Sequence, residues 1–279
     1  MKINYLKNFA FQENLSTQPQ VMALGFFDGV HRGHQQVIGT ARKIAQQRSL
    51  ALGVMTFNRH ASMMFTKQKN TDFRYLNTLD QKVHLMAQQG VDQLYIVNFT
   101  RAFGNVEPQT FVQKYLLGLQ VQVAVAGFDF TFGKYGLAGM QTMQKLGQNK
   151  FQTVTVPKLD EQQQKISSTR IRHLLSSGQI AEARELLGHD YLTVGQVIGK
   201  GQVILPNKMQ QLPPAGQYEC QVTLGKEQHF TTAWVKERSS LPISEIINVD
   251  LSAFQANTPL TPKIQINWLN AIKAKTKNL

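Results

Sequence analysis

Cysteine is almost missing from this sequence, with Cys220 the single one in 279 residues. One cysteine excludes an intrachain disulfide and a zinc site built on a cysteine cluster. Long apolar runs are missing too, because no stretch reaches the roughly 18 residues that a membrane span needs. The first residues, "MKINYLKNFAFQENL", contain no apolar signal core. These absences predict a cytoplasmic protein with no membrane partner.

Acidic residues are scarce, 17 against 30 lysines and arginines, which gives a formal net charge of +13. Such a balance is typical of proteins that bind nucleic acid or small polyanions such as nucleotides. The basic residues form no block, and no DNA- or RNA-binding motif is present. We therefore expect small nucleotides, and not nucleic acid, as partners.

Strand-like and helix-like segments alternate between residues 21 and 190. Buried strands are predicted for "VMALGFF", "LALGVMTF", "VDQLYIVNF" and "VQVAVAGFDF", with helical patterns such as "GHQQVIGTARKIAQQR" between them. This alternation predicts an α/β fold with a doubly wound parallel sheet. Short strands separated by Gly and Pro turns follow, which favours a small antiparallel β-barrel or sandwich. We expect one domain over residues 1–188 and a second over residues 189–279.

The stretch "GFFDGVHRGH", residues 25–34, joins the first buried strand to a helix. Such a turn directs backbone N–H groups and a helix N-terminus toward one point, which suits a phosphate. His31 and His34 can donate hydrogen bonds to phosphate oxygens, and Gly33 leaves room for close approach. The P-loop pattern is absent, and a zinc site would need further ligands. The alternative is that the two histidines only cap the helix.

A second motif, "ISSTRIR", opens a helical stretch at residue 166. Ser167 or Ser168 would serve as N-cap on any helix. Arg170 and Arg172 in the first turn are less expected, because the helix dipole disfavours cations there. A bound anion would offset that conflict, so this motif also indicates a phosphate site.

A third motif, "AGFDFTFG", closes a strand at residues 126–133. If the chain is extended there, Phe128, Phe130 and Phe132 share one face. They would form either a core stripe or a wall for a flat aromatic ligand. Asp129 would point the other way as a hydrogen-bond acceptor.

Taken in order, the motifs resemble those of a known enzyme family. They are "GFFDGVHRGHQ", "VMTFNRH", "LDQKVHLMAQQGVDQLYIVNFTRAFGNVEPQTFV", "AGFDFTFGKYGLAG" and "ISSTRIR". This set is similar to the adenylyltransferase module of the bacterial bifunctional riboflavin kinase/FAD synthetase family, over residues 15–188. That family transfers AMP from ATP to FMN and releases pyrophosphate and FAD. The resemblance implies an FMN adenylyltransferase that uses Mg²⁺.

The resemblance also implies roles for individual residues. The implied catalytic residues are His31, His34, Ser168, Thr169 and Arg172. The implied ATP-binding residues are Gly25, Phe26, Phe27, Gly33, His31, His34, Ser167 and Arg172. The implied flavin-binding residues are Phe57, Phe128, Asp129 and Phe130. No residue is assigned to the metal, and we expect Mg²⁺ to be held mainly by the ATP phosphates.

One motif departs from the family. After Phe57 the family has Asp-Pro-His-Pro, whereas this chain has Asn58-Arg59-His60-Ala61. A turn without the prolines and the carboxylate is expected to be looser, with altered flavin affinity or magnesium handling.

Residues 189–279 resemble the riboflavin kinase barrel of the same family, with the family's catalytic glutamate falling on Glu245. The Gly-x-Pro-Thr-Ala-Asn segment, which serves magnesium and phosphates there, is absent. Only "QVILPNKMQQLPPA" lies between Gly201 and Gly216. We therefore predict a degenerate, folded kinase domain without kinase activity. Bracing of the first domain, flavin sensing and oligomer contacts stay open as its role.

Three functions remain to be distinguished. The favoured one is an FAD synthetase that has lost riboflavin kinase activity, and the second is a fully bifunctional enzyme. The third, of another class, is a non-catalytic flavin- or RNA-binding regulator. The complete histidine and "SSTRIR" sets argue against the third, and the sequence predicts no oligomeric state.

Overall fold

The computed structural model describes residues 1–6, 18–65, 73–161, 164–199, 201–207, 209–236, 246–254 and 263–272. The chain divides into two compact units. The first comprises Met1–Phe73 and Leu79–Lys165, and the second comprises Arg74–Thr78 and Ile166–Leu279. The short segment Arg74–Thr78 thus belongs to the second unit although both of its sequence neighbours belong to the first.

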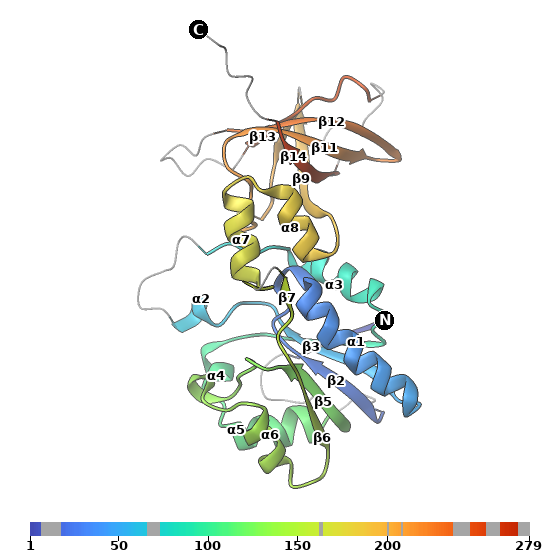
Figure 1. Ribbon diagram of the computed structural model, residues 1–279, viewed down its shortest axis with the longest axis vertical. Coiled ribbons are helices and arrows are strands. Elements are labelled where there is room, and N and C mark those ends of the chain that lie inside the picture. Colours follow the sequence, from blue (N-terminus) through green and yellow to red (C-terminus); the bar gives the residue numbers. More distant parts are fainter. Residues whose placement is uncertain are drawn as a thin grey trace. The chain divides into compact units, whose positions relative to one another are not determined.

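The first unit contains a six-stranded sheet in the order β1-β4-β3-β2-β5-β6. Figure 1 labels β3, β2, β5 and β6 of this sheet. Every neighbouring pair is parallel, which confirms the predicted doubly wound parallel sheet. The strands are β1 (Lys2–Leu6), β2 (Gln20–Leu24), β3 (Ala51–Phe57), β4 (Gln93–Val97), β5 (Val121–Gly127) and β6 (Gln152–Val156).

Helices cover both faces of this sheet, and the side chains of β2 alternate between them. Val21 packs with Ile38 of α1 (Arg32–Gln47), and this cluster includes α3 (Leu79–Gln88). Met22 packs in the opposite cluster with α5 (Pro108–Phe111), the π-helical segment Val112–Leu117 and α6 (Met140–Gly147). The remaining elements are α2 (Ser62–Phe65), α4 (Arg101–Gly104), the 3-10 turns Asp28–Val30 and Lys134–Gly136, and the hairpin strands β7 (Asp160–Glu161) and β8 (Gln164–Lys165).

The strand order places a topological switch between β2 and β5. From β2 the chain adds β3 and β4 on one side, and then crosses over to place β5 on the other side of β2. Open α/β sheets bind their ligands beyond the carboxyl ends of the strands at such a point. The first predicted motif begins at Gly25, directly after β2, and the third lies at the end of β5.

The second unit contains α7 (Ser168–Ser176), α8 (Ile180–Leu187) and a closed barrel in the order β10-β13-β12-β11-β14-β9. All of its strand pairs are antiparallel, so the predicted β-barrel is confirmed. The strands are β9 (Tyr191–Gly199), β10 (Gln202–Ile204), β11 (Gly216–Leu224), β12 (Glu227–Val235), β13 (Ile246–Val249) and β14 (Lys263–Ala271).

The barrel interior is filled by side chains. Trp268 is fully buried and donates a hydrogen bond from Nε1 to Thr193 Oγ1 over 3.1 Å. Tyr218 meets the Trp268 ring edge-on. Cys220 lies in the same interior, where burial raises the pKa of its thiol to about 12. The cysteine is therefore a packed core residue.

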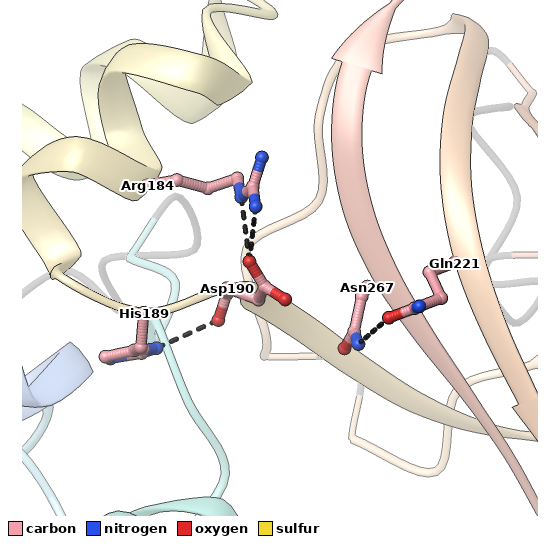
Figure 2. Close-up of polar contacts among 5 residues, drawn as sticks. All are labelled: Arg184, His189, Asp190, Gln221 and Asn267. Atoms are coloured by element: carbon pink, nitrogen blue, oxygen red, sulfur yellow. Dashed lines mark hydrogen bonds and ion pairs between the residues drawn. The ribbon is translucent and has the colours of Figure 1, made fainter. Parts of the chain in front are cut away.

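The helix pair α7–α8 is grouped with the barrel. α8 packs against β9 and β14, and Arg184 of α8 donates from Nε to Asp190 Oδ1 over 3.0 Å (Figure 2). His189 Nδ1 lies 2.9 Å from the Asp190 carbonyl oxygen, and Asn267 of β14 bonds Gln221 of β11. The second compact unit therefore includes α7 and α8 as well as the barrel, whereas the sequence patterns put a boundary after residue 188.

No helix in the described ranges is both long enough and apolar enough to cross a membrane.

Candidate active site

The turn after β2 holds two non-glycine residues in left-handed backbone conformations. Phe27 has a φ of 55° and Val30 a φ of 40°, on either side of Gly29 at 81°. A positive φ is unfavourable for a bulky side chain and most of all for a β-branched one. Phe27 and Val30 are both buried, so packing offsets this cost. Strained backbone is therefore maintained at the predicted phosphate loop.

His31 is the N-cap of α1. Its Nδ1 accepts a hydrogen bond from the His34 backbone N–H over 3.3 Å, and the ring is almost fully buried. Because Nδ1 accepts, a neutral His31 carries its proton on Nε2, which is then a donor. The capping role and the predicted donor role therefore use different nitrogens of one ring.

His34 stacks on His31, with the ring centroids 3.6 Å apart, and meets Phe27 edge-on. Within the described residues its buried Nδ1 has no hydrogen-bond partner. Burial, followed by the charges of His31, Lys82 and Lys165, holds the pKa of His34 well below its usual value. The imidazole of His34 is therefore neutral at neutral pH.

Lys82 on α3 is a buried cation at the same carboxyl edge of the sheet. Its Nζ donates to the Phe26 carbonyl oxygen over 2.8 Å and lies 4.0 Å from the centroid of the Phe26 ring. It also contacts Phe57 O at 3.4 Å and Thr56 Oγ1 at 3.5 Å. Lys82 thereby ties the turn after β2 to the end of β3.

Burial lowers the pKa of Lys82 to about 8, although the nearby Asp28 carboxylate opposes this shift. The sequence patterns assigned no role to Lys82. A signal was present, because Lys82 lies on the helical face marked by Leu79, Val83 and Met86. A lysine on an apolar face is rarely buried unless it has specific partners.

The third motif is not extended in the way its alternation predicts. β5 ends at Gly127, and the Phe130 N–H donates to the Gly127 carbonyl oxygen over 3.1 Å to close a turn. Phe130 and Phe132 stack on each other, whereas Phe128 is 48% exposed. The expectation that the three phenylalanines share one face is therefore wrong, because the turn breaks the alternation.

The β7–β8 hairpin brings two charged residues to this region. Lys165 forms an ion pair with Asp129, and its Nζ lies 4.6 Å from the Phe128 ring centroid. Glu161 pairs with Arg32, at the start of α1, over 3.1 Å. Asp129 therefore has a cationic partner that the sequence patterns did not assign, although Lys165 directly precedes the second motif.

The departure from the family after Phe57 forms an ordered turn. Asn58 donates from Nδ2 to Asn98 Oδ1, and its Oδ1 accepts from the Phe99 N–H, both over 2.9 Å. Phe57 packs edge-on against Phe99. The amide of Asn58 thus ties the end of β3 to the end of β4, and the expectation of a looser turn than in the family stays a prediction.

The second motif forms part of the second unit. Ser167 is the N-cap of α7, with its Oγ accepting from the Arg170 N–H over 3.2 Å, and Ser168 and Thr169 begin the helix. Arg172 donates from Nε to the Arg74 carbonyl oxygen over 2.8 Å. Glu245 lies outside the described residues.

Magnesium was expected to be held mainly by ATP. Across the described ranges, no three His, Cys, Asp or Glu side chains come together in a group that could hold a metal ion.

Comparisons with known proteins agree with the motifs. The FAD synthetase family model matches residues 13–170. Bifunctional riboflavin kinase/FMN adenylyltransferase of Bacillus subtilis is 36% identical over 275 residues, covering 92% of this chain and 85% of the relative. Its Listeria monocytogenes counterpart is 33% identical over 288 residues, covering 99% and 91%. A crystal structure of a Streptococcus pneumoniae protein described as a macrolide-efflux protein matches with a TM-score of 0.85 and 25% identity, covering 99% of this chain and 93% of that one. The chain belongs to the FAD synthetase family.

Proposed function

We propose that this protein transfers AMP from ATP to FMN, giving FAD and pyrophosphate. The observation that carries the proposal is the stacked His31–His34 pair at the β2–β5 switch point, inside the region that the family model matches. A nucleotide phosphate is the ligand that this position of an α/β sheet binds most readily.

The reaction needs little from a general base, because FMN already carries a nucleophilic phosphate. A phosphate oxygen of FMN forms a bond to the α-phosphorus of ATP, and the bond from that phosphorus to the bridging oxygen breaks. The bonding electrons leave with pyrophosphate. The enzyme must align two anions and stabilise negative charge as it develops.

The described residues supply what such a transition state requires. His31 offers its Nε2–H, and neutral His34 can give a hydrogen bond without carrying the cost of a buried charge. Lys82 and Lys165 are the cations whose charges reach His34. A polyanion bound here would be stabilised by both lysines.

The other roles implied by the resemblance are proposals of the same kind. For triphosphate binding these are Ser168, Thr169 and Arg172, with Ser167 and the backbone of Gly25, Phe26, Phe27 and Gly33. For flavin binding they are Phe57, Phe128, Asp129 and Phe130. We propose that the adenylyltransferase module comprises residues 1–188. Mg²⁺ is proposed to arrive as part of the Mg-ATP substrate.

A fully bifunctional enzyme is the second candidate, favoured by the names of the two relatives, each of which covers more than nine-tenths of this chain. We propose that the kinase activity is lost, on the single ground that the Gly-x-Pro-Thr-Ala-Asn segment is missing from the sequence.

One assay separates the candidates. The purified protein is incubated with Mg-ATP and either FMN or riboflavin, and the flavins are resolved by chromatography. FAD from FMN with no product from riboflavin supports our proposal. FMN appearing from riboflavin would establish the bifunctional enzyme instead. A protein that forms neither product would be the non-catalytic regulator.

In the same assay, His31→Ala is expected to lower the rate of FAD formation at least about 100-fold, or about 2.7 kcal/mol at the transition state. The variant removes both the Nε2–H donor and the N-cap of α1. His84→Ala is the matched control, because His84 lies exposed on α3. Near-normal turnover of the His31 variant would contradict the proposed role.

A further inference from the structure

The segment Arg74–Thr78 is bound to a loop of the barrel through its backbone. The Tyr75 N–H donates to the Met209 carbonyl oxygen over 2.7 Å, and the Gln211 N–H donates to Tyr75 O over 2.8 Å. These two bonds form a parallel bridge between Tyr75 and Gln210. The segment is therefore held as one more short strand beside residues 209–211.

A buried amide fixes this junction. Gln210 is only 1% exposed, and its Nε2 donates to Leu192 O over 2.8 Å and to Leu76 O over 3.4 Å. Tyr191 donates from its hydroxyl to the carbonyl oxygen of Gln211. Buried carbonyls that lose their donor are costly, so the Gln210 amide specifies one position of the segment relative to β9.

The same segment holds Arg172. The Arg74 carbonyl oxygen accepts from Arg172 Nε over 2.8 Å. A guanidinium group is planar, and its donors have fixed relative directions. A bond at Nε therefore fixes where the remaining N–H groups of Arg172 point.

The helix that carries Arg172 is anchored on the barrel as well. Ile171 and Leu175 of α7 are fully buried, and α7 packs on α8. α8 packs against β9 and β14 and is joined to Asp190 through Arg184. Both the arginine and the carbonyl oxygen that it binds are thus positioned by the barrel.

We infer that the barrel serves the adenylyl transfer, because its residues 209–211 hold Arg74–Thr78 and this segment orients Arg172, with Gln210 as the positioning residue. The inference rests on the proposed function, in which Arg172 binds the triphosphate. The loop concerned lies within "QVILPNKMQQLPPA", where the kinase phosphate segment is missing. A barrel without that segment would still be needed for FAD formation.

The test measures kcat and KM for ATP in full-length Gln210→Met, which preserves the size of the side chain and removes the amide. We expect kcat/KM for ATP to fall about tenfold, the equivalent of one lost hydrogen-bond contribution of about 1.4 kcal/mol. Gln211→Met is the matched control, because it changes the neighbouring glutamine and keeps the backbone bond to Tyr75. The control should have the kinetics of the unaltered protein.

A double-mutant cycle with Arg172→Met separates positioning from general destabilisation. If Gln210 acts through Arg172, adding Gln210→Met to Arg172→Met should lower kcat/KM less than twofold. All rates are taken well below the unfolding midpoint of each variant. If Gln210→Met does not fold, Gln210→Asn, which keeps an amide on a shorter side chain, enters the same cycle.

The outcomes are distinct. Absence of FAD with the unaltered protein would overturn the proposed function, and unaltered kinetics of Arg172→Met would overturn the role of Arg172. Equal kcat/KM for ATP in the Gln210 variant and the unaltered protein would overturn the positioning role alone. The positioning role would also be overturned if the fold-losses in kcat/KM of the two single variants multiply in the double variant. Gln210 and Arg172 would then act independently.

Discussion

At the scale of single residues, the central feature is a pair of imidazoles that cannot both be charged at low cost. His31 and His34 stack with 3.6 Å between their ring centroids, and His31 is buried while His34 is half-buried. Two like charges at such a separation repel strongly where water is excluded. His34 is therefore suited to donating a hydrogen bond as a neutral ring.

A pH dependence of stability follows for His34, because its pKa is lower in the folded protein than in the unfolded chain. As the pH falls below about 6.5, the unfolded chain takes up a proton that the folded protein does not, so the free energy of unfolding decreases, by up to about 1.4 kcal/mol per pH unit. His34→Gln should lose less stability than the unaltered protein over this range. Urea unfolding at about pH 7 and about pH 5 measures the difference.

His84→Gln, which replaces an exposed histidine of α3, serves as the control. If the free energy of unfolding changes equally with pH in His34→Gln and in the unaltered protein, the prediction is contradicted, because His34 would then have the same pKa in the folded and unfolded states.

Lys82 gives a second prediction. Lys82→Met keeps the apolar length of the side chain but removes the charged Nζ donor, which shares the Phe26 carbonyl oxygen with the Thr56 hydroxyl. The free energy of unfolding should fall by about 2 kcal/mol at neutral pH. Above pH 8 the folded protein loses the Lys82 proton, whereas the unfolded chain holds it up to a pKa of about 10.4. The unaltered protein therefore becomes more stable as the pH rises, and its difference in unfolding free energy from Lys82→Met should increase. Urea unfolding across this range provides the test, and a difference that narrows with rising pH would contradict it.

These residues show what a sequence can predict at this scale. The positions of His31, His34 and Ser167 could be predicted, because each residue lies close in sequence to a strand end or a helix start. Lys82 and Lys165 were missed, because tertiary packing determines which groups a lysine side chain contacts. The separate, exposed position of Phe128 was missed because one backbone bond, from the Phe130 N–H to the Gly127 carbonyl oxygen, ends the extended strand.

At the scale of elements, two glycine turns in the barrel make a matched pair. Gly201 has a φ of 75°, and a Cβ there would lie 2.2 Å from Val249 O. Gly225 has a φ of 63°, but nothing lies within 4 Å of its Cβ position. Conformational strain is common to both positions, whereas a steric clash with backbone belongs to Gly201 alone.

Gly225→Ala should therefore cost about 1 kcal/mol of unfolding free energy, the cost of a left-handed alanine. Gly201→Ala should cost at least about 2 kcal/mol more, because the carbonyl of Val249 must move. Chemical unfolding followed by circular dichroism compares the two variants. Equal costs would mean that the strand β13 can shift freely at Val249.

Longer elements were predicted well and short ones were not. The strands β2, β3, β4 and β5 are rich in apolar residues, so composition and length locate them. β1 escaped prediction because it is an edge strand with exposed residues, and α2 and α4 have only four residues each. The segment Val112–Leu117 is π-helical, and helix propensity does not distinguish this conformation from an α-helix.

At the scale of the whole molecule, the net charge of +13 should draw anionic substrates toward the protein. We expect kcat/KM for ATP to fall several-fold as the salt concentration rises from about 20 mM to about 200 mM, with little change in kcat. Steady-state kinetics with added KCl measures this, and an equal osmolality of glucose is the control. An unchanged kcat/KM would mean that the charge acts only locally.

The division into units could not be read from the sequence. A change from alternating helices and strands to short strands marks the start of the barrel, and so suggests a boundary near residue 188. Tertiary contacts produce no such pattern in the sequence. Here they are the packing of α8 on β9 and β14 and the Arg184–Asp190 pair. The same holds for Arg74–Thr78, whose partners lie far along the chain.

That distance sets an order of events during synthesis. Gln210 and Leu76 are 134 residues apart, so the ribosome releases Arg74–Thr78 long before its partners exist. The parallel sheet can begin to form while this stretch has nothing to pair with, and native pairing must wait until the loop at 209–211 has emerged. Folding of this chain therefore includes a step that closes a long loop, and in a chain stalled on the ribosome before residue 209 the segment that binds Arg172 would lack its partners.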